Sequence, residues 1–412
     1  MRIPQYIRRA IQMVIGLALF VVVGIMLLLG VLWLDHRRET TLPTPTGPFA
    51  VGRTTYVWSD AAHTDPMAPQ PGTHRELLAW IWYPAASRPP SPALADYLPT
   101  PWRTAFSRQV SPLLTQFVTR DLARVRAHSF REAEVSPQQR SYPVVFLRGG
   151  LATLTTDYTT LAEDLASHGY VVVGFDAPYR SMVAVFPDGR VIARTPQNNV
   201  ELVGDSQKMP LAAKLAQTWS ADLSFALDQL AQLNASDPSG RFRGQLNLQQ
   251  IGAFGHSLGG ATALQFCHDD PRCQAGIDID GLPLGSVIRE GVMQPFLFLL
   301  SDHTGEPGAE SSQVMADIRS LYDRLPANCR WYVVIRGAGH YQFSDHGALL
   351  QMPLVLSVLH TLGIMSLDGR RQLAITQHYV STFFDVYLKG APASELRRQG
   401  QYPEVEYLPD EH

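Results

Sequence analysis

Residues 251–267 read IGAFGHSLGGATALQFC, and this stretch predicts a buried strand, a sharp turn and a helix in direct succession. Residues 251–254 are apolar and partly β-branched, and residues 261–267 favour a helix. The pattern Gly-x-Ser-x-Gly between them places small residues on both sides of Ser257, as a tight strand-to-helix turn requires. We expect Ser257 to be a nucleophile held on that turn. The plainer interpretation is a serine in a glycine-rich loop, because short patterns of this kind also occur by chance.

Outward from this stretch, the chain from about residue 50 onward alternates between strand-like and helix-like patterns. This alternation predicts an α/β fold in which a mainly parallel central sheet has helices on both faces. One expected helix, TTLAEDLASHG (159–169), ends in a glycine, and another has an apolar face at Trp219, Leu223, Ala226, Leu230 and Leu233. The expected strands are RTTYVW (53–58), LLAWIWYP (77–84), PVVFLR (143–148), YVVVGFD (170–176), IGAFG (251–255), AGIDID (275–280), PFLFLL (295–300) and WYVVIRG (331–337).

Two segments do not fit the alternation. Residues 186–194, FPDGRVIAR, are typical of a β-hairpin. Residues 91–135 contain a helical apolar period, which predicts an amphipathic helix with its apolar face at Val110, Leu113, Leu114, Phe117 and Val118. This helix would either pack on the core, which is the default, or cover the active site as a lid.

The N-terminus predicts a membrane anchor. Residues 10–34 contain no charged side chain, and these 25 residues form an almost wholly apolar run. As a helix the run would reach roughly 37 Å, enough to cross a hydrocarbon core of about 30 Å. A cleaved signal peptide is the competing interpretation, but the run exceeds the usual apolar region and no small-residue cleavage site follows it. Since the arginines of residues 1–9 precede the span, we expect that end in the cytoplasm and the rest outside.

Beyond the anchor, residues 35–49 include TTLPTPTGP and predict an extended stalk, and residues 50–412 form the folded domain. Cys267 and Cys273 flank a loop short enough to be closed by a disulfide, which would leave Cys329 unpaired. Three buried, reduced cysteines are the alternative. No C-x-x-C or His-rich tract suggests a metal. The net charge of −3, without a basic cluster after the N-terminus, gives no footprint for nucleic acid.

His340 is the expected base. It lies in IRGAGHYQF (335–343), directly after an apolar strand and in a glycine-containing loop. A serine hydroxyl attacks poorly unless a group that titrates near neutrality takes its proton and returns it to the leaving group, and an imidazole meets this need. His303 and His346 are expected at the surface or behind the reacting groups.

The acid partner has two candidates at strand ends. Asp280 ends AGIDID, and Asp302 ends FLFLLSD after the following strand. The acid fixes the imidazole tautomer and stabilises the imidazolium, so it should lie at a strand end near the base. Asp278 alternates with Asp280 and points the same way, but lies deeper in the sheet. The residues alone leave Asp280 or Asp302.

Six segments together resemble the α/β-hydrolases related to platelet-activating factor acetylhydrolase of the plasma type. The likeness covers roughly residues 50–350, and the segments around Ser257, Asp280 and His340 are more specific than the serine pattern alone. In order, the segments are PVVFLRGG (143–150), DLASHGYVVVGFD (164–176), IGAFGHSLGGATALQF (251–266), AGIDIDGLPLG (275–285), QPFLFLLSD (294–302) and VVIRGAGHYQFSD (333–345).

The resemblance implies roles for particular residues. It assigns the acid to Asp280 and leaves Asp302 in reserve. It places the oxyanion hole at the backbone N–H groups of Gly150 and Leu258, which would stabilise the charge of the tetrahedral intermediate. The sequence departs from the family at Arg148, where a histidine is usual. Arg148 would either form a structural ion pair, the safer interpretation, or meet a polar or anionic group of the substrate.

The sequence thus predicts a membrane-anchored serine hydrolase that acts on carboxylic esters through an acyl-enzyme. The resemblance implies short acyl chains on phospholipids or related esters, no calcium requirement and no cofactor. A general carboxylesterase or lipase and a polyester hydrolase are the alternative enzymes. A hydrolase-like binding module without activity is the alternative outside enzymes, although such modules usually lack a member of the triad, whereas Ser257, Asp280 and His340 are all present here.

Overall fold

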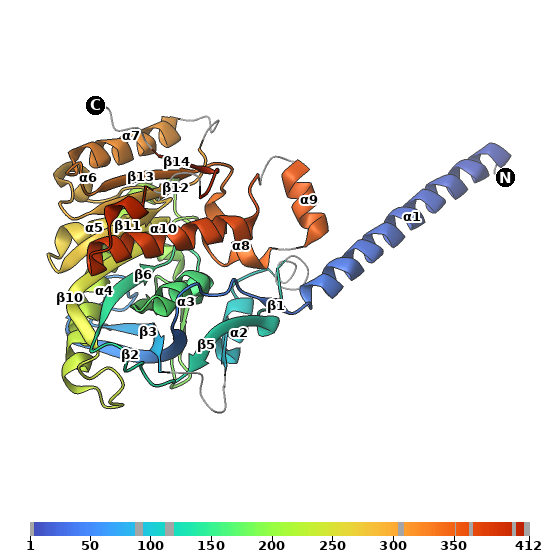
Figure 1. Cartoon of the computed structure of the whole chain (residues 1–412). Helices are drawn as coiled ribbons and strands as arrows, with labels where there is room; N and C mark the ends of the chain where they lie inside the picture. The colour runs from blue at the N-terminus through green and yellow to red at the C-terminus, as the bar shows by residue number, and fades with distance from the viewer. Residues whose placement is uncertain are drawn as a thin grey trace.

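The computed structural model describes residues 4–407, except 87–93, 112–118, 304–308, 351, 362–365 and 398–400. One long N-terminal helix, α1 (Gln5–His36), projects from a domain in which helices cover a large sheet (Figure 1). The other helices are α2 (Thr100–Ser107), α3 (Thr159–Ser167), α4 (Asp205–Ser236), α5 (Leu258–Asp269), α6 (Val287–Glu290), α7 (Ala309–Arg324), α8 (His346–Leu349), α9 (Pro353–Thr361) and α10 (Gly369–Lys389).

The central sheet contains all eight strands that the sequence predicts. Its order is β1-β5-β2-β3-β7-β6-β10-β11-β12-β13-β14, with β4 paired to β5, and the run from β7 to β13 is parallel. This confirms the predicted mainly parallel sheet. The strands are β1 (Thr40–Thr41), β2 (Ala50–Thr64), β3 (His74–Ala85), β4 (Leu94–Asp96), β5 (Val125–Arg131), β6 (Tyr142–Arg148), β7 (Val171–Asp176), β10 (Leu246–His256), β11 (Cys273–Ile279), β12 (Phe296–Leu300), β13 (Arg330–Ile335) and β14 (Val405–Tyr407).

Two apolar layers hold the helices on the sheet, one on each face. Side chains of α4, α5 and α7 pack against one face, and those of α3 and α10 pack against the other. Strand β6 shows why both faces are covered, because Val144 and Phe146 belong to the first layer and Val145 and Leu147 to the second. The predicted face of α4 is buried at all five positions.

The two irregular segments have different outcomes. Residues 186–194 close a hairpin between β8 (Val183–Val185) and β9 (Val191–Ala193), as predicted. The segment 91–135 contains α2, β4 and β5, which were not predicted. The amphipathic helix expected around residues 110–118 falls largely on residues 112–118, outside the described part of the chain.

The N-terminal segment joins α1 to the domain through several contacts. α1 is long and apolar enough to be either a membrane anchor or a signal sequence. At its end Asp35 forms an ion pair with Arg120, with the guanidinium 3.0 Å from the carboxylate. Residues 40–49 then lie along the domain, where the backbone N–H groups of Thr46 and Phe49 donate to the Asp164 carboxylate and to the Ser167 carbonyl.

Candidate active site

Ser257 lies on a strained turn between β10 and α5. Its backbone has φ 57° and ψ −127°, a conformation that residues other than glycine rarely adopt. The flanking glycines allow this turn, because a Cβ on Gly255 would lie 2.1 Å from the Gly259 carbonyl oxygen, and one on Gly259 would lie 2.0 Å from that of Arg148. The strand, turn and helix predicted for residues 251–267 are therefore observed with Ser257 at the turn.

His340 and Asp280 form a close pair beside this turn. His340 Nδ1 lies 2.6 Å from Asp280 Oδ2, and the carboxylate side chain is fully buried. Asp280 follows β11, and His340 begins the short 3₁₀ helix His340–Phe343 after β13. The His340 ring packs on that of His256, the residue before Ser257, with 4.5 Å between ring centroids. The structure thus brings all three predicted triad residues to the carboxyl ends of β10, β11 and β13, at one edge of the sheet.

The predicted contact between Ser257 and His340 is not made in this structure. In the described part of the chain, no hydrogen bond joins Ser257 Oγ to His340. Such bonds are often long in enzymes without substrate and shorten in the reacting complex.

Asp280 has further hydrogen-bond partners. Ser301 donates to it from both its backbone N–H and its hydroxyl, and His303 Nε2 lies 2.9 Å from Oδ1. Burial alone would raise the pKa of Asp280, but the hydrogen bonds from His303 and His340 outweigh it and hold that pKa well below its usual range. Asp280 is therefore a carboxylate at neutral pH. The contact with His303 was not predicted.

The other two acids of this region have different surroundings. Asp302, the reserve acid, accepts a 2.8 Å hydrogen bond at Oδ2 from the backbone N–H of Gly337, and so links the end of β12 to the loop before His340. Asp278 is fully buried against Gly260. Burial raises the pKa of Asp278 well above its usual range, and the charge of Asp280 adds to this effect, so both favour the protonated form of Asp278.

The two amides expected in the oxyanion hole differ in their surroundings. Leu258 is the first residue of α5, where a backbone N–H has no partner within the helix. Gly150 lies against the turn, since a Cβ on it would be 3.1 Å from Ser257 Cβ. Its N–H donates to the Tyr158 hydroxyl at 3.1 Å, and that hydroxyl lies 2.8 Å from His256 Nδ1. Burial lowers the pKa of His256 to about 3, so the ring is neutral at neutral pH.

Arg148 is a buried residue of the scaffold. Its guanidinium stacks on Trp219, with 3.8 Å to the ring centroid, and donates to the Phe175 carbonyl oxygen at 2.9 Å. Burial lowers the pKa of Arg148 to about 10, while the charges of Asp176 and Asp222 act in the opposite direction. Only 4% of the surface of Arg148 is exposed, and this burial argues against contact with a substrate.

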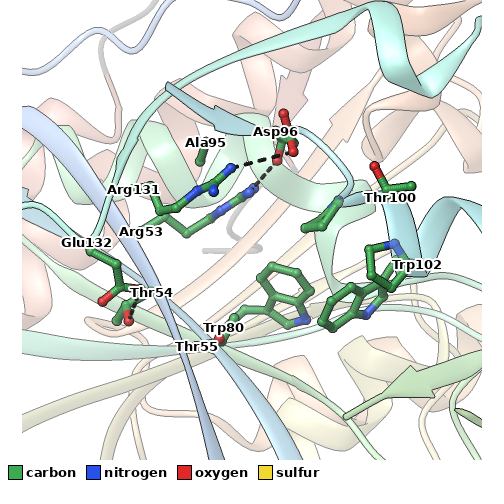
Figure 2. Close-up of a pocket in the computed structure, with 12 residues that line it drawn as sticks. Arg53, Thr54, Thr55, Trp80, Ala95, Asp96, Thr100, Trp102, Arg131 and Glu132 are labelled. Carbon is green, nitrogen blue, oxygen red and sulfur yellow. Dashed lines mark hydrogen bonds and ion pairs between the residues drawn. The ribbon is translucent and has the colours of Figure 1, made fainter. Parts of the chain in front are cut away.

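A separate cavity of about 370 Å³ lies over β2, β3 and the start of α2 (Figure 2). Trp80 and Trp102 form its aromatic wall, and Arg53 and Arg131 point toward Asp96. Its two arginines are balanced by Asp96 and Glu132, so the lining has no net charge. Ser257, Asp280 and His340 do not line this cavity.

The region around α5 contains a disulfide. A disulfide joins Cys267 and Cys273, whose Cα atoms are 5.0 Å apart, and Cys329 is a buried free thiol. Across the described residues, no group of three or more His, Cys, Asp or Glu side chains is arranged to hold a metal ion.

Comparison with known proteins gives a family for this chain. The sequence profile of platelet-activating factor acetylhydrolase, isoform II, matches residues 35–389. The chain belongs to this family. Within the family, the platelet-activating factor acetylhydrolase of Cavia porcellus is 24% identical over 259 residues, which cover 58% of this chain and 58% of the relative's length.

Two other relatives match a larger share of the chain. A protein of Arthroderma benhamiae named a probable 1-alkyl-2-acetylglycerophosphocholine esterase is 24% identical over 392 residues, covering 89% of this chain and 93% of its own. The solved structure of ferulic acid esterase from Streptomyces cinnamoneus is 28% identical, with a TM-score of 0.73, and the match covers 90% of this chain and 100% of that one. These relatives are all named as ester hydrolases.

Proposed function

We propose that this chain is a membrane-anchored serine hydrolase that cleaves carboxylic esters through a covalent acyl-enzyme. One observation carries the proposal: Ser257 is held at φ 57° on the turn between β10 and α5, beside a His340–Asp280 pair with 2.6 Å between Nδ1 and Oδ2. A strained serine next to an imidazole that a buried carboxylate orients is the arrangement that nucleophilic catalysis by serine requires.

In the proposed reaction Ser257 Oγ attacks the ester carbonyl while His340 Nε2 takes the serine proton. The tetrahedral intermediate collapses, His340 returns the proton to the leaving alcohol, and an acyl-enzyme remains. Water then attacks the acyl group with His340 as base, which releases the acid and restores Ser257. Asp280 stays ionised throughout, fixes the tautomer with the proton on Nδ1, and stabilises the imidazolium.

The developing oxyanion needs backbone donors. We assign the N–H of Leu258 as the first donor, since the first turn of a helix leaves its N–H groups without internal partners. Gly150 is the second, and it would have to exchange the Tyr158 hydroxyl for the oxyanion as the substrate binds. A donor of this kind typically contributes about 2.7–4 kcal/mol to lowering the barrier.

Short-chain acyl esters, phospholipids among them, are the proposed substrate class. The names of the acetylhydrolase and the 1-alkyl-2-acetylglycerophosphocholine esterase relatives support this choice. The ferulic acid esterase likeness favours a second candidate, a carboxylesterase for esters with long or bulky acyl groups.

A series of p-nitrophenyl esters from acetate to laurate, assayed with the wild type and Ser257→Ala, tests the reaction and the acyl preference together. The proposal predicts highest kcat/KM for acetate and butyrate, because a pocket closed at its far end rejects longer chains by overlap. Ser257→Ala should lose at least about 1,000-fold in kcat. Ser236→Ala, at an exposed serine at the end of α4, should match the wild type. Turnover by Ser257→Ala near the wild-type rate would refute the proposal, as would absence of turnover in the wild type.

A further inference from the structure

Asp280 is held by a second histidine besides His340. We infer that His303 is a positioning residue that fixes the Asp280 carboxylate through its Oδ1 atom, while His340 uses Oδ2. This inference rests on the proposed function, because it assigns His303 a task in orienting the proposed base. His303 Nε2 is 2.9 Å from Oδ1, and His340 Nδ1 is 2.6 Å from Oδ2.

The hydrogen bonds around Asp280 leave its carboxylate a single orientation. An ionised carboxylate has about four lone-pair positions. Oδ1 accepts from the Ser301 backbone N–H at 2.8 Å and faces His303 Nε2, whereas Oδ2 faces His340 Nδ1. The Ser301 hydroxyl lies between them, 2.8 Å from Oδ2, 2.9 Å from Oδ1 and 3.2 Å from His303 Nε2. Because donors face both oxygens, rotation about the Cβ–Cγ bond would break hydrogen bonds on both of them. His303 and Ser301 thus keep Oδ2 aimed at His340.

The position of His303 explains why it can clamp the carboxylate. Ser301 directly follows β12, and His303 is two residues further, so both sides of the clamp extend from one buried strand. Asp280 itself comes from the end of β11, the strand next to β12 in the sheet. The His303 side chain is 27% exposed while that of Asp280 is fully buried, so the ring separates part of the carboxylate from solvent.

The contact also affects how strongly Asp280 attracts the proton on His340. A donor on Oδ1 shares the negative charge of the carboxylate and so limits how far Asp280 stabilises the imidazolium form of His340. The other titratable groups that interact with Asp280 are Asp278 on its own strand and His256 from β10. Burial raises the pKa of Asp278 and lowers that of His256 to about 3, so both groups favour their uncharged forms.

A pair of substitutions separates the donor from the bulk of the ring. His303→Gln keeps an amide N–H donor near the position of Nε2, and His303→Leu keeps a similar volume without any donor. We expect His303→Leu to lower kcat for p-nitrophenyl acetate about tenfold with little change in KM, because the lost hydrogen bond no longer holds Asp280 with Oδ2 aimed at His340. The acidic limb of its kcat/KM profile should move to higher pH, because Asp280 then favours the imidazolium of His340 more strongly. His303→Gln should retain kcat within about threefold and an unshifted profile.

Two results would overturn the inference. One is a His303→Leu enzyme with the kcat and pH profile of the wild type. The other is a His303→Gln enzyme impaired as much as His303→Leu, which would show that the ring contributes to activity only by its packing. Melting temperatures of both variants identify a folding defect, and His303→Gln carries the test if His303→Leu does not fold. Labelling of the wild type by a fluorophosphonate separates failure of the inference from failure of the proposed function. If the wild type is labelled and the two variants behave alike, only the inference fails, whereas an unlabelled wild type removes the proposed function and the inference together.

Discussion

At the scale of single residues, the acid of the site has a direct test. Asp280→Asn should reduce kcat by at least about 100-fold, because an amide donor facing Nδ1 would favour the tautomer that leaves Ser257 without a base. Asp302→Asn is the matched control and should keep most activity, since the asparagine oxygen can still accept from the Gly337 N–H. Steady-state kinetics on p-nitrophenyl acetate measures both variants. The opposite order of the two losses would transfer the role to Asp302.

The sequence predicted some residues of the site because their signals are local. The turn at Ser257 needs glycines at fixed offsets, and His340 follows an apolar strand within a short glycine-containing loop. The choice between Asp280 and Asp302 came from the family resemblance, and the roles of all these residues stay predictions. The contact of His303 depends on a partner 23 residues away, and that of Tyr158 with His256 on one 98 residues away. Only the two-residue spacing of Ser301 and His303 at a strand end could have indicated the clamp.

At the scale of elements, a buried ion cluster ties the loop after β7 to α4 and to the segment after β2. Arg180 lies 2.5 Å from Asp65 and 2.9 Å from Asp222, and all three side chains are fully buried. Arg180→Met should lower the free energy of unfolding by about 3–5 kcal/mol, because it leaves the buried Asp65 carboxylate without Arg180 and leaves Asp222 with its longer, 3.4 Å contact to Arg75. Denaturant unfolding of the purified protein gives this value.

Arg190 provides the control for this prediction. It also pairs with two carboxylates, those of Glu76 and Asp188, but its side chain is 46% exposed. Arg190→Met should therefore cost less than about 1 kcal/mol. Equal losses for Arg180→Met and Arg190→Met would contradict the assignment of the buried cluster as a tie between elements.

The elements that the sequence missed are those stabilised by distant partners. The predicted strands are apolar runs, and such runs indicate burial from the sequence alone. Strand β5, VRAHSFR, is mixed instead, with exposed and buried positions interspersed. Its pairing with β1, β2 and β4 makes it a strand, and such pairing is not visible in a local pattern. Residues 40–49 likewise carry few apolar side chains, yet backbone hydrogen bonds hold them to α3 and the loop after it.

At the scale of the whole molecule, we propose that α1 is an uncleaved anchor with its N-terminus in the cytoplasm and the domain outside. The ion pair of Asp35 with Arg120 places the end of α1 against the folded domain. A reporter active only outside the cytoplasm, fused after His412, should therefore be active. Protease added to sealed cells should digest the domain. Protection of the whole chain, or a mature protein that begins after residue 34, would contradict this arrangement.

The most direct test of the central claim is to locate the covalent adduct left by a fluorophosphonate inhibitor. Trypsin cleavage after Arg243 and Arg272 releases the peptide 244–272, in which Ser257 is the only serine. After reduction of the disulfide, mass spectrometry should find the phosphonyl group on this peptide, with fragment ions that assign it to Ser257, and it should be absent from Ser257→Ala. An adduct on another peptide would contradict the assignment of Ser257 as the nucleophile. So would a folded wild-type protein that carries no adduct and whose ester hydrolysis the inhibitor does not reduce.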